Sequence, residues 1–154
     1  MGIRAARFPD DLSRVQSLFR EYADSLGIDL SFQGFEQELA SLPGKYSPPD
    51  GDSWLAEHDG ATVGCVAMRP LAGRTCEMKR LFVRPQFRGL SLGRQLAETV
   101  LAAAVEKGYQ RICLDTLPSM TQAQELYRQM GFVEVESYCH NPVPGAVFMA
   151  KELV

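Results

Sequence analysis

The stretch with the clearest potential for chemistry spans residues 77–94, where a strand pattern, a basic turn and the start of a helix follow one another. Gly89 and Gly93 allow a ligand to approach the main chain closely, because glycine carries no Cβ. A helix that opens after such a turn presents free backbone N–H groups and the positive end of its dipole. Three arginines add positive charge here: Arg84, Arg88 and Arg94. The stretch therefore predicts a site for an anion such as a pyrophosphate, with an ordinary turn bearing solvated arginines as the alternative.

Two common phosphate-binding motifs are absent from this stretch. No Gly-Lys-Ser or Gly-Lys-Thr follows the turn, so it is not the phosphate loop of a nucleotide hydrolase. The Gly-x-Gly-x-x-Gly spacing of dinucleotide-binding proteins is absent as well. The predicted anion site is therefore of a different type.

Two motifs resemble those of the GNAT superfamily of N-acetyltransferases. The run Val83-x-Pro85-x-x-Arg88-Gly89-x-Ser91-Leu92-Gly93 resembles the family's acetyl-CoA signature, Gln/Arg-x-x-Gly-x-Gly/Ala, which follows a strand ending in Val-x-Pro. Ser91 stands where the family usually has its first Gly. The run Ala123-x-x-Leu126-Tyr127-x-x-Met130-Gly131-Phe132 resembles the family's Ala-x-x-Leu-Tyr-x-x-x-Gly-Phe segment. The motifs follow in the family's order and together cover roughly the second half of the chain.

The resemblance implies the GNAT fold, in which two parallel strands of a mixed α/β sheet splay apart and the pantetheine arm of acetyl-CoA enters the gap. The strands here would be residues 75–83 and 111–115. Splayed strands leave backbone groups unpaired, which is costly when they are buried, and the amide-rich arm would pair with them. The residues implied to bind the cofactor are Leu81, Phe82 and Val83 for the arm, and Arg88, Gly89, Leu90, Ser91, Leu92, Gly93 and Arg94 for the pyrophosphate.

The reaction implied is direct attack of an amine on the thioester carbonyl. Tyr127 matches the family's general acid, and a phenol with an ordinary pKa of about 10 can protonate a departing thiolate. Glu77 resembles the general-base Glu of some members, and its parity predicts the same strand face as Leu81 and Val83. The alternatives are a core aromatic for Tyr127 and a solvated carboxylate for Glu77. Met120 stands where the family often has an Asn.

Composition and charge narrow the class of protein. A length of 154 residues predicts a single domain over residues 1–154, burying about 70% of its unfolded surface. The formal net charge of -3 disfavours a general nucleic-acid binder, which is usually basic. The 4 cysteines include no Cys-x-x-Cys pair, so we expect neither a metal site nor a disulfide framework. The absence of a signal peptide and of a long apolar run predicts a cytoplasmic protein with no membrane partner.

The periodicity of apolar residues predicts where helices and strands lie. Strands are expected at residues 3–8, 54–58, 61–68, 75–83, 111–115, 132–138 and 146–153, with the longer helices at 12–26, at 90–107 and from 119 to 130. Asp59-Gly60 predicts a hairpin with a type I′ turn. Ser119 and Gln122 have the spacing of a capping box.

Further helix caps are expected near the N-terminus. Asp10 or Asp11 suits the start of the first helix. Ser31 suits the start of a short second helix that carries Phe32 and Phe35 and closes at Pro43-Gly44.

The acceptor side carries no recognised motif. A peptide amine, a protein lysine, a polyamine, an amino acid and an antibiotic all fit the predicted chemistry, and a homodimer is one option for assembly. The candidate lining residues are Tyr22, Tyr46, Tyr138 and His140, with plain packing as the alternative for each. A second hypothesis, motivated by Ser91 and Met120, is a CoA-binding regulatory or interaction module without turnover.

Overall fold

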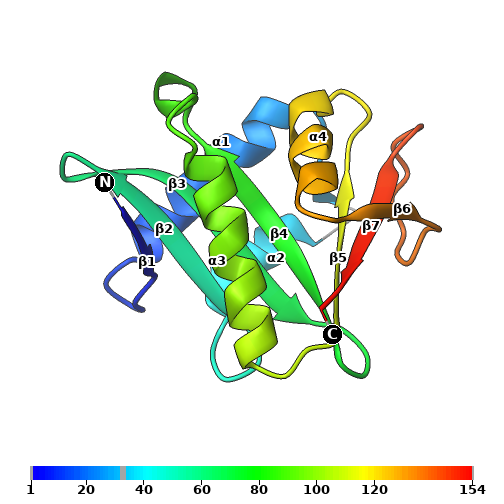
Figure 1. Ribbon diagram of the computed structural model, residues 1–154. Helices are drawn as coiled ribbons and strands as arrows, with labels where there is room; N and C mark the ends of the chain where they lie inside the picture. The colour runs from blue at the N-terminus through cyan, green and yellow to red at the C-terminus, as the bar shows by residue number, and fades with distance from the viewer. Residues whose placement is uncertain (1, 32–33, 154) are drawn as a thin grey trace.

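A computed structural model describes residues 2–31 and 34–153 (Figure 1). Its strands are β1 (Gly2–Ala5), β2 (Asp52–His58), β3 (Ala61–Pro70), β4 (Thr75–Val83), β5 (Arg111–Thr116), β6 (Val133–Val135) and β7 (Val147–Glu152). Its helices are α1 (Leu12–Leu26), α2 (Phe35–Ala40), the short 3-10 helix η2 (Pro85–Phe87), α3 (Leu92–Glu106) and α4 (Thr121–Gln129). The strands form one sheet in the order β1-β2-β3-β4-β5-β7-β6. These elements confirm the predicted mixed α/β sheet.

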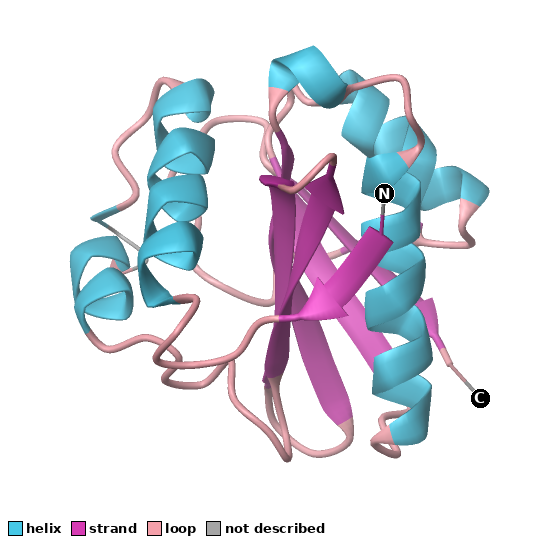
Figure 2. Cartoon of the chain, turned by 90° about the vertical axis from the view of Figure 1, so that its left-hand side faces the viewer, coloured by secondary structure: helices cyan, strands magenta, loops and turns pink. Residues whose placement is uncertain are grey.

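Helices cover both faces of the sheet, as Figures 1 and 2 show. α3 packs against β2, β3 and β4, whereas α1 packs against β3 and β4 from the other face. The apolar residues of β4 divide between these two faces. Met78 and Val83 lie in the core beneath α3, and Phe82 lies in the core beneath α1 and α2. β4 is thus buried on both faces, including its charged residues Glu77, Lys79 and Arg80.

β4 and β5 are parallel neighbours that separate partway along their length. Their ladder holds three residue pairs, which are Thr75 with Arg111, Cys76 with Ile112 and Glu77 with Cys113. β4 continues to Val83 and β5 to Thr116, with no further pairing between these described segments. The two strands therefore splay beyond Glu77, as the sequence resemblance implied. The splay leaves main-chain groups of both strands facing a gap rather than a neighbouring strand.

A β-bulge in β4 changes which face its side chains occupy. Cys65 of β3 pairs with Phe82 and Ala67 pairs with Lys79, so two residues of β4 lie opposite one residue of β3. Arg80, within the bulge, has a φ of 62°. An extra residue reverses the alternation of a strand beyond it. The prediction that Glu77 shares a face with Leu81 and Val83 is therefore wrong, because the bulge lies between them.

Glycine-dependent turns are predicted better than the helix caps. Asp59 and Gly60 have φ values of 50° and 80°, as a type I′ turn requires, and β2 and β3 pair around them. The capping box is wrong, because α4 begins after Met120 without a side-chain cap. α2 follows Gly34 rather than Ser31, and it ends at Ala40, before Pro43. Phe32, assigned to this helix from the sequence, lies outside the described residues.

Asp11 precedes α1 but does not cap it through its side chain. Its carboxylate instead accepts hydrogen bonds from the Arg7 N–H at 2.8 Å and from the Arg4 guanidinium at 2.7 and 3.0 Å. The residue ties β1, the following loop and α1 together. At the other end of the chain, β6 covers only Val133–Val135, shorter than the strand predicted over residues 132–138.

Candidate active site

A groove of about 620 Å³ runs along the end of β4 and the turn that leads into α3. Eight of the ten residues predicted to bind the cofactor line it: Leu81, Phe82, Val83, Arg88, Gly89, Ser91, Leu92 and Gly93. The opposite wall includes Ser25 and Leu26 of α1 and residues 119–123 at the start of α4. Leu90 and Arg94, the remaining two of the ten predicted cofactor-binding residues, are not among the described residues that line the groove. The volume is within the range of about 300–1,000 Å³ that is typical of small-molecule sites.

The backbone of the turn is open to this groove. Gly89 and Ser91 have φ values of 90° and 61°, in the left-handed region that favours glycine. Ser91 is the N-cap of α3 but makes no side-chain cap hydrogen bond. The left-handed backbone of Ser91 explains why the acetyl-CoA signature usually has glycine here, because a residue with a Cβ is disfavoured in this conformation. At Gly93 a Cβ would meet no atom within 4 Å, so the structure leaves space beside this residue.

The three arginines of the turn point in different directions. Arg88 lines the groove, and its Nε donates to the Val83 carbonyl at 3.1 Å. Arg94 donates to Gln129 of α4 at 2.6 Å. Arg84 pairs with Glu21 of α1 through hydrogen bonds of 2.9 and 2.8 Å, so it ties the strand end to that helix. The expectation that all three crowd one anion site is wrong for Arg84.

Main-chain groups at the end of β4 face the gap. The Arg84 N–H donates to the Val63 carbonyl of β3 at 2.8 Å. Because backbone groups of successive residues in an antiparallel ladder point in opposite directions, those of Val83 point away from β3 and toward β5. Thus β4 presents hydrogen-bonding groups to the space where β5 has separated from it.

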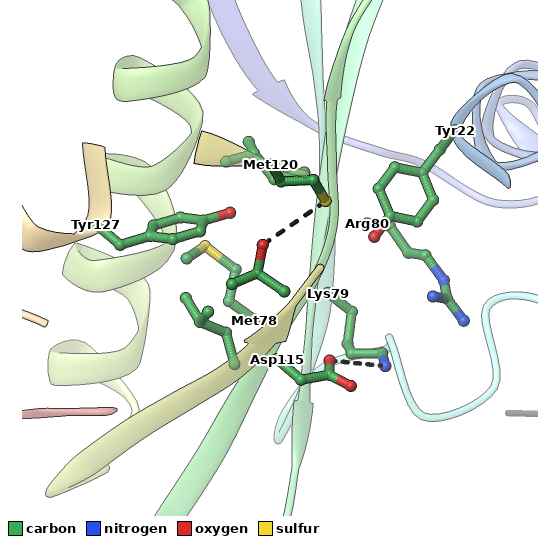
Figure 3. Close-up of a pocket in the computed structure, with 10 residues that line it drawn as sticks. Tyr22, Met78, Lys79, Arg80, Asp115, Met120 and Tyr127 are labelled. Atoms are coloured by element: carbon green, nitrogen blue, oxygen red, sulfur yellow. Dashed lines mark hydrogen bonds and ion pairs between the residues drawn. The ribbon is translucent and has the colours of Figure 1, made fainter. Parts of the chain in front are cut away.

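A small cavity of about 20 Å³ occupies the gap itself and shares Tyr22, Leu81 and Met120 with the groove (Figure 3). Tyr127 of α4 enters it from one side with its hydroxyl toward the cavity, and Tyr22 of α1 lies on the other. No hydrogen bond joins the Tyr127 hydroxyl to another group within residues 2–31 and 34–153. Burial raises the pKa of Tyr127 above its ordinary value, so the phenol keeps its proton at neutral pH.

Met120 and Thr116 complete the upper part of this cavity, where the Thr116 hydroxyl donates to the Met120 sulfur at 3.6 Å. Met120 also lines the groove, so it sits at the junction of the two spaces. The position that often carries an Asn in the related motif therefore presents a polarisable thioether instead.

Glu77 is fully buried and, with Cys113, forms the last residue pair between β4 and β5. It accepts hydrogen bonds from Arg69 Nε at 2.7 Å and from the Tyr138 hydroxyl at 2.5 Å. These three side chains line a cavity of about 440 Å³ on the far side of β4 from Tyr127. The alternative of a solvated strand-end carboxylate is therefore wrong. The structure also does not bring Glu77 and Tyr127 into one cavity.

A fourth space, of about 240 Å³, opens on the same side of the sheet as Glu77 and is rich in charge. Its lining includes three basic side chains, Arg69, Lys79 and Arg80, and two carboxylates, Glu38 and Asp115. Lys79, Arg80 and Asp115 line the gap cavity as well, so they connect the two spaces. His140 and Cys139 close this space from the loop before β7. We refer to it as the acceptor-side cavity.

The sequence reasoning missed Arg69, Lys79, Arg80 and Asp115, although a signal was present. Lys79 and Arg80 are charged residues in the middle of a strand that also carries Glu77, and all three are buried. Buried charges are rare unless paired. Arg80 pairs with Glu38 through hydrogen bonds of 2.9 and 3.0 Å. Burial lowers the pKa of Lys79, while the nearby carboxylates of Glu77 and Asp115 act in the opposite direction.

Sequence comparison establishes the family. The model of the Acetyltransferase (GNAT) family matches residues 15–132, so the chain belongs to this family. An uncharacterized N-acetyltransferase of Schizosaccharomyces pombe is 41% identical over 155 residues, covering 99% of this chain and 95% of that protein. Human N-acetylaspartate synthetase is 32% identical over 117 residues, covering 75% of this chain and 39% of that longer protein. The chain is accordingly an N-acetyltransferase of the GNAT family.

Structure comparison agrees with this assignment. An aminoglycoside 6′-N-acetyltransferase solved in complex with coenzyme A superposes with a TM-score of 0.74, covering 100% of this chain and 98% of that one at 17% identity. The similarity establishes that the two chains share the GNAT fold. No helix in the described part of the chain is both long and apolar enough to cross a membrane.

Proposed function

We propose that this enzyme transfers an acetyl group from acetyl-CoA to a primary amine of a small molecule by direct attack. The observation that carries the proposal is the splay of β4 from β5. The splay leaves a cavity of about 20 Å³ that shares lining residues with the groove at the start of α3 and with the charged acceptor-side cavity. We propose that the thioester is placed here, where the cofactor arm enters from the groove and the amine approaches from the acceptor-side cavity.

The groove suits coenzyme A in chemistry as well as in size. Leu81, Phe82 and Val83 line the groove, and we propose that the main chain of Leu81 and Val83 bonds the amides of the pantetheine arm, with the Val83 carbonyl shared with Arg88 Nε. The pyrophosphate is proposed to lie on residues 88–93, where Arg88 supplies charge and the first turn of α3 supplies N–H groups. Leu90 and Arg94 then act at the edge of this site rather than within it.

Tyr127 is proposed to protonate the departing thiolate. Its hydroxyl points into the gap, it has no competing protein partner among the described residues, and its raised pKa keeps it protonated at neutral pH. A thiol, with an ordinary pKa of about 8.5, is a stronger acid than this phenol, so the proton is proposed to move as the C–S bond breaks rather than to a thiolate already released. The contact of Tyr127 with Phe132, with ring centroids 5.7 Å apart, holds the phenol ring in position.

Glu77 is proposed as the base that accepts the amine's proton through water. The cavity that it lines shares Arg69 and Cys139 with the acceptor-side cavity, so the two spaces adjoin, and the proton is proposed to pass between them through water. The name of the N-acetylaspartate synthetase relative supports a small-molecule amine as the acceptor.

The proposal is tested by incubating the protein with acetyl-CoA and a panel of peptides, polyamines, amino acids and antibiotics. Thiol release and the mass of an N-acetylated product are the readouts. Amine-dependent thiol release with a matching product supports it. CoA-dependent thermal stabilisation without release from any amine would instead indicate a CoA-binding module.

A further inference from the structure

The acceptor-side cavity holds fixed charges of both signs, and their arrangement limits what amine can enter. Its three basic side chains each have a carboxylate partner: Arg69 with Glu77, Lys79 with Asp115, and Arg80 with Glu38. The cavity therefore has no excess of negative charge to attract a polycation such as a polyamine or an aminoglycoside. A volume of about 240 Å³ is also small, which favours a compact molecule over a peptide chain.

Arg69 is the basic residue of this cavity with unused donors. Its Nε donates to Glu77 at 2.7 Å, whereas its two terminal nitrogens donate to no acceptor among the described residues. Its side chain is 29% exposed, compared with 5% for Lys79 and 2% for Arg80. A guanidinium fixed at Nε and open at its outer edge matches the two oxygens of a carboxylate.

The Arg80 guanidinium is held by contacts within the protein. It pairs with Glu38 through two nitrogens, and it lies 5.3 Å from the ring centroid of Phe35 and 5.8 Å from that of Tyr22. This packing gives it a structural role behind the cavity. The difference between Arg80 and Arg69 therefore assigns anion binding to Arg69.

Asp115 supplies the opposite charge at the inner end. It lines both the gap cavity and the acceptor-side cavity, accepts a hydrogen bond from Asn141 at 3.1 Å, and lies 3.9 Å from Lys79 Nζ, with which an incoming ammonium would share it. An ammonium beside Asp115 would therefore lie next to the gap in which the thioester is proposed to sit. If the same molecule also carries a carboxylate, that group would then extend toward Arg69.

We propose that the acceptor is a small amine that also bears a carboxylate, such as a free amino acid. Its carboxylate is held by Arg69 and its amine is placed at the gap by Asp115. This inference rests on the proposed function, since it names the acceptor of the same site.

The first test uses the wild-type enzyme alone and three matched acceptors: the best amino acid in a panel, its α-carboxamide and its decarboxylated amine. We expect kcat/KM for the acid to exceed that of both analogues by at least about 10²-fold, because a site built for a charged group rejects analogues that lack it. If amines are acetylated but the analogues react equally well or better, the inference is overturned. If no amine releases thiol, the proposed function itself fails, which is a distinct outcome.

The second test separates Arg69 from the general fold. Arg69→Gln should lower kcat/KM for the acid by about 10²-fold and remove the preference over the analogues, with CoA affinity unchanged. Arg69→Lys should recover part of the loss, and Arg14→Gln, which removes an exposed arginine of α1, should have no effect. An equal loss for all three acceptors in a folded Arg69→Gln protein would contradict the inference. If that variant does not fold, the wild-type comparison decides alone.

Discussion

Lys79 and Asp115 face each other across the gap between β4 and β5, with Nζ and Oδ1 3.9 Å apart. The pair lies where the two strands have ceased to share hydrogen bonds, so it is a side-chain link across the splay (Figure 3). Both residues are more than nine-tenths buried in their side chains, at 5% and 9% exposure. A polar pair in this position keeps the gap from closing into a continuous apolar core and leaves a charged wall for the amine.

The two carboxylates on this side of the sheet should affect the reaction differently. Glu77→Gln should lower kcat/KM most at low pH, where a base must remove the ammonium proton, and least at high pH, where the free amine is already neutral. Asp115→Asn should raise the KM for the amine at every pH, because it removes charge that positions the substrate. The measurement is kcat/KM against pH for both variants and the wild type. A parallel loss at all pH values in Glu77→Gln would contradict its assignment as the base.

Gly93 offers a test of where the cofactor's phosphates lie. The structure itself leaves room for a Cβ at this position, so Gly93→Ala should fold normally. If a phosphate approaches the main chain there, CoA affinity should fall by about 10–10²-fold, the equivalent of one lost hydrogen bond to a charged group. Isothermal titration with CoA and a thermal melt measure both effects.

Ser91→Gly is the matched comparison. It should raise stability by about 1 kcal/mol by relieving the left-handed backbone of Ser91, and it should keep or improve CoA affinity. Normal CoA binding by Gly93→Ala would move the phosphate site away from this turn. A large loss of affinity in Ser91→Gly would show that the Ser91 hydroxyl itself contacts the phosphate.

The position of the charged cavity could not be predicted from the sequence, whereas the sheet and the groove could. Leu81, Val83 and Gly93 belong to a contiguous motif, so local pattern was sufficient to place them in the groove. Arg69 and Asp115 lie on different strands, and only the sheet order brings them to one cavity. Single-sequence patterns carry no signal of that pairing.

The β-bulge explains the main error about the site. Strand parity assumes strict alternation, and one additional residue at Arg80 reverses it for all residues beyond. Glu77 and Leu81 therefore lie on opposite faces although their spacing is even. The predicted side-chain cap of α1 was wrong for a different reason. The Asp11 carboxylate accepts hydrogen bonds from Arg4 and Arg7 instead of from the first turn of the helix.

Asp11 should contribute stability that depends on pH. The Arg4 guanidinium holds the pKa of Asp11 well below its usual range, so its stabilisation is complete above the unfolded pKa of about 3.9 and is lost as pH falls toward the lower folded value. Asp11→Asn should cost about 1–3 kcal/mol at pH 7. The difference from the wild type should shrink below about pH 4.

Urea denaturation at neutral and acidic pH measures this difference. Asp10→Asn, at the exposed neighbouring position, is the control and should change little. A cost for Asp11→Asn that persists unchanged at acidic pH would mean that the carboxylate's charge is not the source of the stability.

The central claim is that Tyr127 protonates the departing thiolate in the gap between β4 and β5, and it is tested most directly by single-turnover kinetics of Tyr127→Phe. Phe keeps the ring and its contact with Phe132, so CoA affinity and melting temperature should remain those of the wild type. Thiol release with bound acetyl-CoA and saturating amine should slow by about 10²-fold, and Tyr22→Phe, which removes the hydroxyl across the cavity, should slow it less. An unchanged rate of thiol release in Tyr127→Phe, with chemistry rate-limiting, would contradict the account and return Tyr127 to the role of a core aromatic.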